Sequence, residues 1–137
     1  MLRGSWCVAA LAAALTACGV PGQAAAQTSP VMVTGAEIES WFAADEMAVA
    51  GFGLSNNCHW MTKGPKAERT QTVYCPGAKP FTVVGEARLE GNKLCSKFVY
   101  PDGSRFDTCQ EIFKVGENKY EGRAGGVHRT TFYRLLR

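Results

Sequence analysis

The chain has 137 residues, of which 46% are hydrophobic and 20% charged, and its formal net charge is +3 at pH 7. This length suffices for one compact domain and is too short for two. The charged residues are scattered without a run of like sign, which argues against nucleic acid binding.

The first 26 residues have the layout of an export signal. Arg3 supplies a positive charge, and residues 8–17 form an apolar run that is too short to span a bilayer. Two cleavage points follow. Leu-Thr-Ala-Cys at 15–18 resembles the lipobox of bacterial lipoproteins, and the alanines at 24–26 form an A-x-A site. We expect a signal peptide over residues 1–17, with residues 1–26 as the alternative.

Cleavage before Cys18 predicts lipidation of that cysteine. Residues 18–33 are then a flexible tether, because they are small, uncharged and interrupted by two prolines. The acyl chains contribute about 0.8 kcal/mol for each methylene that enters a membrane. The predicted location is the periplasm, with the protein anchored to the outer membrane through Cys18.

The predicted domain, residues 34–137, opens with a helix. Thr34 and Glu37 have the spacing of a capping box, in which each side chain bonds the other residue's backbone amide. The following apolar residues recur at helical spacing and define one face, which we expect to pack against a sheet. They are Ile38, Trp41 and Phe42. Glycines at 51 and 53 limit this helix, so we predict it over residues 35–44.

Beyond the helix, the hydrophobic period changes to two, which is typical of strands. The clearest hairpin joins 81–90 to 93–100 through Gly91-Asn92, a pair that readily adopts positive φ. Further strands are predicted over 69–75, 105–115, 119–123 and 128–136, with weaker ones near 47–53 and 58–62. Short turns join about eight strands, so we predict a mainly β antiparallel meander that forms a small barrel or sandwich.

Four of the six cysteines lie in the predicted domain under either cleavage. An even number in an exported chain suggests two disulfides, and four cysteines allow three pairings. We favour Cys58–Cys75 and Cys95–Cys109, because each pair brackets an evident turn. Each bridge is expected to contribute about 3 kcal/mol in the chain-entropy model.

Candidates for chemistry are few. Cys58, His59 and Met61 offer a soft-metal ligand set, but an exported cysteine is more often oxidised, so we expect no metal and no cofactor. His128 follows two glycines and is expected to be exposed in a turn. No nucleophile elbow, phosphate-binding loop or acid–base pair is evident from the spacing, and we expect a protein that is not an enzyme.

A longer pattern extends over the second half of the domain. It consists of the strand and turn at 85–95, then Cys109, then Lys-Val-Gly-Glu-Asn-Lys-Tyr at 114–120, and the opening at 34–38 belongs to it. This pattern resembles small exported bacterial proteins of the family called domain of unknown function 995. The resemblance implies an exported single domain without known catalytic residues. Residues 54–80 depart from it.

Two functions are compatible with these features. The first is a non-enzymatic envelope domain that binds another protein, an inhibitor of an exported hydrolase being one form, with loop 62–69 presented to the partner. The second is a barrel that carries a small apolar ligand, as lipocalins do. Five residues are candidates for binding: Trp60, Lys63, Lys66, Arg69 and Tyr74.

Overall fold

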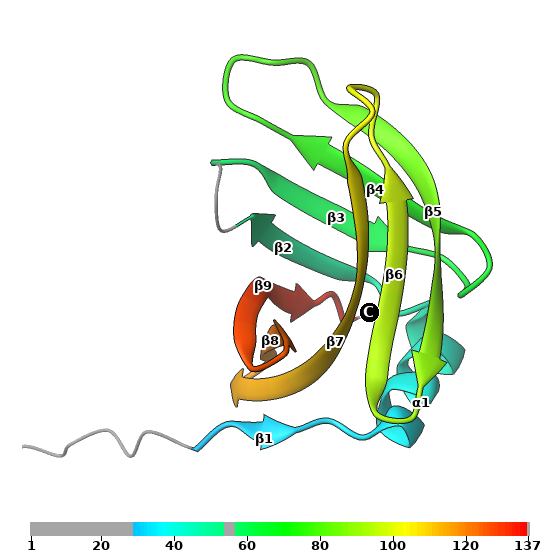
Figure 1. Ribbon diagram of the computed structural model, residues 1–137, viewed down its shortest axis with the longest axis vertical. Coiled ribbons are helices and arrows are strands. Elements are labelled where there is room, and N and C mark those ends of the chain that lie inside the picture. Colours follow the sequence, from blue (N-terminus) through cyan, green and yellow to red (C-terminus); the bar gives the residue numbers. More distant parts are fainter. Residues whose placement is uncertain (1–28, 54–56, 137) are drawn as a thin grey trace, which may run out of the picture.

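The structure is a computed structural model that describes residues 29–53 and 57–136. These ranges contain one helix and nine strands, named in chain order as β1 (Val31–Met32), α1 (Gly35–Asp45), β2 (Val49–Gly53), β3 (His59–Lys63), β4 (Arg69–Tyr74), β5 (Phe81–Glu90), β6 (Lys93–Val99), β7 (Arg105–Gly116), β8 (Lys119–Ala124) and β9 (Val127–Arg134). From β2 to β9, each strand pairs antiparallel with the next, and β9 pairs back with β2 (Figure 1). The predicted mainly β meander is confirmed, and it closes as a barrel.

The helix begins and ends close to its predicted bounds of 35–44. The Thr34 hydroxyl accepts a hydrogen bond from the Glu37 amide at 3.2 Å, which is the first half of the predicted capping box. The Gly35 amide instead donates to the Asn92 side chain at 2.8 Å, so the β5–β6 turn completes the cap. At the other end, Glu46 adopts the left-handed conformation, with φ of 57°, and its amide bonds the Phe42 carbonyl.

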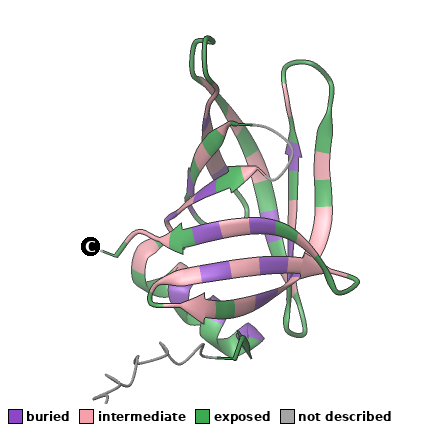
Figure 2. Ribbon diagram, turned by 90° about the vertical axis from the view of Figure 1, so that its left-hand side faces the viewer, coloured by how far each residue is buried: buried purple, intermediate pink, exposed green. Residues whose placement is uncertain are grey.

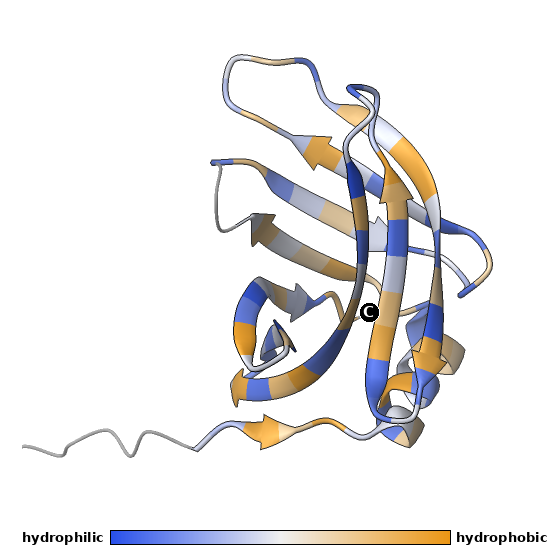
Figure 3. Cartoon of the chain, in the orientation of Figure 1, coloured by the Kyte–Doolittle hydropathy of each residue, from blue (hydrophilic) through white to orange (hydrophobic). Residues whose placement is uncertain are grey.

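The strands bury alternate residues, as the period of two predicts. Along β5, residues 81, 83, 85, 87 and 89 are at least partly buried, and the residues between them are exposed (Figure 2). Apolar and polar bands alternate along the strands in the same way (Figure 3). Gly91 has a φ of 60°, as the tight β5–β6 turn requires. The predicted tight hairpin, with its period of two along β5, is therefore confirmed.

The domain begins before Thr34. Val31 and Met32 form β1, which pairs with Lys114 and Phe113 of β7, just past the residue that faces the start of β6. Val33 is 2% exposed, and its amide bonds the Ile112 carbonyl at 2.8 Å. Residues 31–33 were expected in the tether, but the structure makes them part of the domain. The predicted signal peptide, Cys18 and most of the tether lie outside the described residues.

The two ends of the barrel differ, because successive turns of a meander alternate between them. The β3–β4 and β5–β6 connections lie at the end that carries α1 (Figure 1). There, Lys66 forms an ion pair with Glu39 of α1 at 2.5 Å, and Asn92 bonds the start of α1. The β4–β5, β6–β7 and β8–β9 connections lie at the opposite end, which no helix of the described ranges covers.

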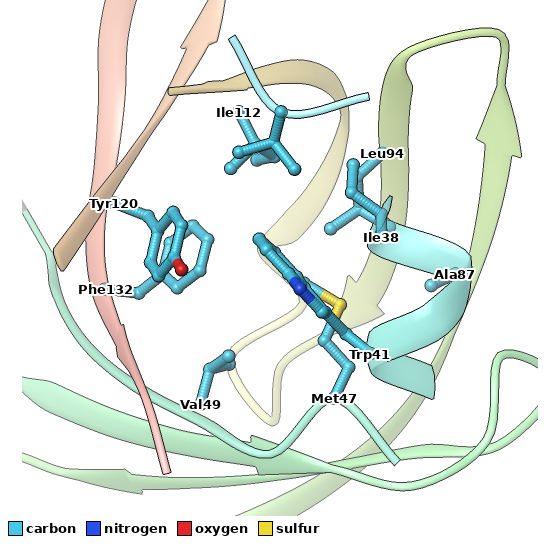
Figure 4. Close-up of a cluster of buried hydrophobic side chains, with 10 residues drawn as sticks. Ile38, Trp41, Met47, Val49, Ala87, Leu94, Ile112, Tyr120 and Phe132 are labelled. Atoms are coloured by element: carbon cyan, nitrogen blue, oxygen red, sulfur yellow. The ribbon is translucent and has the colours of Figure 1, made fainter. Parts of the chain in front are cut away.

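The core fills the barrel at the α1 end (Figure 4). Trp41 extends from the helix to within 5.0 Å of Tyr120, measured between ring centroids, and Tyr120 stacks on Phe132 at 5.5 Å. The predicted packing of Trp41 and Phe42 against the sheet is confirmed, with Phe42 only partly buried. The other buried residues of the cluster are Val33, Ile38, Met47, Val49, Ala87, Leu94 and Ile112.

Both predicted disulfides are present. Cys95 and Cys109 are direct partners in the β6–β7 register, and Cys58–Cys75 joins the residues that flank the β3–β4 hairpin. Two disulfides in one small domain are typical of an oxidising, exported environment. Within residues 29–53 and 57–136, no helix combines the length and apolar character needed to cross a bilayer.

Removing the Cys95–Cys109 bridge by a double Cys→Ala variant is expected to lower the free energy of unfolding by about 3 kcal/mol, since a short loop is released in the unfolded chain. The two cysteines are 14 positions apart. Urea denaturation monitored by circular dichroism measures the change. Wild-type protein denatured in the presence of a reductant is the control. Its free energy of unfolding should fall by more, because both disulfides open. An unchanged urea midpoint for the variant would contradict the prediction.

Candidate functional site

The barrel encloses a cavity above its core. An inner chamber of about 90 Å³ lies over Met47, Leu94 and Phe132, and an outer chamber of about 760 Å³ reaches the end opposite α1. The two chambers share five lining residues and therefore adjoin each other: Trp60, Gln71, Tyr100, Phe106 and Thr130. The outer volume lies within the range of about 300–1,000 Å³ that small-molecule sites occupy.

Glycines inside two strands determine where the cavity walls lie. A Cβ atom on Gly51 of β2 would lie 2.2 Å from the Trp60 ring, so this ring lies directly on the β2 backbone. A Cβ atom on Gly85 of β5 would lie 2.4 Å from the Phe98 ring. Without the glycines, both rings would have to move toward the centre of the barrel and reduce the space there.

The outer chamber has an aromatic wall. Phe81 and Tyr100 meet edge to face with 6.4 Å between ring centroids, and Trp60, Phe106 and Val73 continue the apolar surface. The Cys58–Cys75 disulfide lies on the same rim, where it joins the β3 and β4 sides. Because β3 and β4 are paired neighbours, the bridge holds their ends together at the rim of the chamber.

One polar cluster crosses the cavity wall from β6 to β3. The Tyr100 hydroxyl donates to the Gln71 carbonyl oxygen at 2.9 Å, and the Gln71 amide donates to the Thr62 hydroxyl at 3.2 Å. Burial raises the pKa of Tyr100, so its phenol stays protonated at neutral pH. The cluster therefore consists entirely of neutral groups.

A second polar cluster connects β7 and β9. The Thr130 hydroxyl donates to the Gln110 carbonyl oxygen at 2.9 Å, and the two residues are 9% and 6% exposed. Gly122 of β8 makes room for them, since a Cβ there would lie 2.2 Å from the Gln110 oxygen. Among the described residues, nothing accepts a hydrogen bond from the Gln110 amide nitrogen.

Arg69 lies at the inner end of the cavity. It was expected at the end of loop 62–69, presented to a partner, but it is 4% exposed and lines the inner chamber. Its guanidinium donates to the backbone carbonyls of Glu46, Gly64 and Met47, and it lies 5.0 Å from the centre of the Phe42 ring. Burial lowers the pKa of Arg69 to about 10, so the group is a cation at neutral pH.

The structure separates the five predicted binding residues. Trp60 and Arg69 line the cavity. Lys63 is exposed, and Lys66 pairs with Glu39, so loop 62–69 is bound to the helix. Tyr74 is not among the cavity-lining residues, and it stacks on His59 at 4.9 Å between ring centroids.

The possible ligand sets for a metal contain oxidised cysteines. Cys58, next to His59, is in a disulfide and offers no thiolate. Glu90 lies near Cys95 and Cys109, but these two sulfurs are bonded to each other. Each set thus lacks the thiolates that a soft metal requires.

His128 was expected to be exposed in a turn. The structure shows it half-buried in the outer chamber, with Nε2 2.9 Å from both the Thr130 carbonyl and the Thr131 hydroxyl. Ser104 lines the same chamber, where it donates to Asp102 at 2.6 Å. Within the described residues, no hydrogen bond joins His128 to Ser104, so the two do not form a histidine–serine pair.

Sequence reasoning did not identify the polar residues of the cavity. Gln71 and Gln110 occupy inward positions of predicted strands, next to the apolar residues Val73 and Ile112. A buried amide on an apolar strand face requires a hydrogen-bond partner. A glutamine at an inward position of an alternating strand could therefore have been recognised as a polar site from the sequence. The position of the partners depends on strands that are distant in the chain.

Comparisons of the chain with protein-family models, with curated proteins and with solved structures find no match. The resemblance to domain of unknown function 995 stays a prediction.

Proposed function

We propose that this protein binds one small, largely apolar molecule inside its barrel. The observation that carries the proposal is a cavity that is closed by α1 at one end and open at the other. This is the carrier function that the sequence suggested as the alternative to a protein-interaction module.

The cavity wall supports an apolar ligand. Trp60, Phe81 and Phe106 supply flat apolar surfaces along the outer chamber, and the core residues form the floor. Burying apolar ligand surface here contributes about 25 cal/mol for each Å² removed from water. The neutral hydroxyl and amide groups supply a few directed contacts, a division that is typical of small-molecule sites.

The outer face of the barrel favours a second candidate, the protein-interaction module. Phe52 is 53% exposed, Met61 44% and Tyr133 37%, on neighbouring strands β2, β3 and β9. Exposed apolar groups that gather on one face favour association with a partner. This surface does not overlap with the cavity, so one function does not exclude the other.

Export to the periplasm with a lipid on Cys18 is also a proposal, and the two disulfides support the oxidising compartment that it requires. Labelling of cells with a palmitate analogue tests the anchor. A labelled wild-type protein and an unlabelled Cys18→Ala variant are the expected results, and an unlabelled wild type would exclude lipidation.

The neutral fluorophore N-phenylnaphthylamine is expected to bind the purified full-length protein with one site per chain and increased emission. Val73→Trp should abolish or strongly reduce this binding, because Val73 lines the outer chamber and an indole would occupy it. Val84→Trp is the matched control, since Val84 on β5 is 61% exposed. Fluorescence titration measures both variants.

Equal binding by the two variants would contradict the cavity as the site. Absence of fluorophore binding to the wild type would contradict the carrier function itself, and capture of a protein partner through Phe52 and Met61 would then favour the interaction module.

A further inference from the structure

The Gln110 side chain uses only one of its two polar atoms in hydrogen bonds within the described residues. It is 6% exposed, and its carbonyl oxygen accepts from Thr130, whereas its amide nitrogen carries two hydrogens without an acceptor among the described residues. Gln110 lines the inner chamber, so an acceptor on a molecule inside the cavity can bind this nitrogen.

The position of Gln110 suits a ligand contact. Gln110 lines the inner chamber together with Ser96, Phe98 and Phe106, so an acceptor that binds it is attached to a molecule lying against the aromatic wall. Thr130 holds the amide oxygen, and this bond leaves the amide nitrogen for the ligand. The amide is therefore oriented before the ligand enters.

The groups next to Gln110 favour an uncharged acceptor. Arg69 is the one cation that lines the inner chamber among the described residues, and three backbone carbonyls bind its guanidinium, whereas Arg129 lines the outer chamber. The other polar groups of this chamber are amides and hydroxyls. Gln110 and its partner Thr130 are neutral, so a carboxylate bonded to the Gln110 amide would lose hydration in exchange for one neutral donor, which is costly in a buried site.

We propose that the ligand is an uncharged, largely aromatic or aliphatic molecule with a carbonyl oxygen, such as a ketone or a quinone, and that this oxygen accepts a hydrogen bond from the Gln110 amide. This proposal rests on the proposed function, since it specifies the chemical class of the molecule in the same cavity.

Three dyes of nearly equal size test the ligand class with the full-length protein. The first is prodan, a neutral naphthyl ketone. The second has a propyl group in place of the propionyl group and thus no carbonyl oxygen, and the third carries a carboxylate. We expect the ketone to bind about tenfold more tightly than the propyl dye, which corresponds to one hydrogen bond from a buried donor.

The variant Gln110→Leu tests the assigned donor. It should remove most of the preference for the ketone while leaving the affinity for the propyl dye within about twofold. Ser96→Ala is the matched control, because Ser96 lines the same chamber, and this variant should retain the preference. The infrared carbonyl stretch of the bound ketone should shift to higher frequency in Gln110→Leu, because a hydrogen bond weakens the C=O bond.

The outcomes distinguish the two proposals. If none of the dyes binds, the carrier function fails. If the propyl dye binds as tightly as the ketone, or the carboxylate binds best, the cavity is a binding site but the carbonyl proposal is wrong. The comparison of dyes on wild-type protein decides the ligand class even where Gln110→Leu does not fold. An unchanged ketone preference and infrared band in a folded Gln110→Leu would overturn the assignment of the donor.

Discussion

Replacing Arg134 by Met is expected to lower the free energy of unfolding by about 3–5 kcal/mol, because it leaves a buried carboxylate without its cation. Arg134, on the last strand, forms an ion pair with Asp45 at the end of α1, and their side chains are 10% and 8% exposed. The guanidinium also lies 4.7 Å from the centre of the Trp41 ring. Urea denaturation followed by circular dichroism measures the loss.

The double variant Asp45→Asn with Arg134→Met separates the two contributions. It is expected to recover much of the stability, because the methionine still contacts Trp41 and no unpaired charge remains. The matched surface control is Arg88→Met, since Arg88 forms an exposed pair with Glu90 and should change stability by less than about 1 kcal/mol. Equal losses of stability in Arg134→Met and Arg88→Met would show that burial does not determine the contribution of the Arg134–Asp45 ion pair.

Replacing Trp41 by Ala is expected to cost about 3–5 kcal/mol of stability. Trp41 is 5% exposed and packs on Tyr120 from the helix side, so alanine leaves a void between α1 and the barrel. The same measurement of unfolding applies. Trp41→Phe is the control, and its free energy of unfolding should fall clearly less, because an aromatic ring remains beside Tyr120. Figure 4 shows Trp41 and Tyr120 in the core.

Trp41→Ala also tests the helix as the closed end of the cavity. If α1 loosens, the void joins the inner chamber, and the neutral fluorophore should bind with altered affinity while the fold persists at low denaturant. A stability loss of less than about 1 kcal/mol would contradict the central position of Trp41 in the core.

These two predictions concern the same place, where the first and last elements of the barrel meet. Asp45 and Trp41 belong to α1, and Arg134 ends β9. The helix is thus held against the barrel by a buried ion pair and a cation–π contact as well as by apolar contacts. A cavity that opens only at the other end depends on this attachment.

Local features of the structure could be predicted from the sequence, because they depend on neighbouring residues. Thr34 caps the helix three residues away, and Gly91 supplies the positive φ of a two-residue turn. The alternation along 81–90 gives the buried face of β5 correctly. The two disulfides follow from the turns that their cysteines bracket, since antiparallel neighbours bring such residues opposite each other.

The candidate site was only partly predicted. Trp60 was identified as an aromatic residue for binding, and it lines the cavity. Arg69 was predicted at the end of the presented loop 62–69, because the sequence cannot show that carbonyls from Glu46, Gly64 and Met47 converge around its guanidinium. These carbonyls come from segments that meet only in the folded chain.

By itself, the sequence determined one helix, a meander of about eight strands, two disulfides and the inward face of the central hairpin, since each depends on residues close together in the chain. Tertiary structure alone decided that the meander closes into a barrel, because closure requires β2 to pair with β9 across almost the whole domain. It also decided that Gln71 and Gln110 face a shared cavity. Hydrogen-bond partners and empty space both arise from long-range pairing, and no local pattern encodes them.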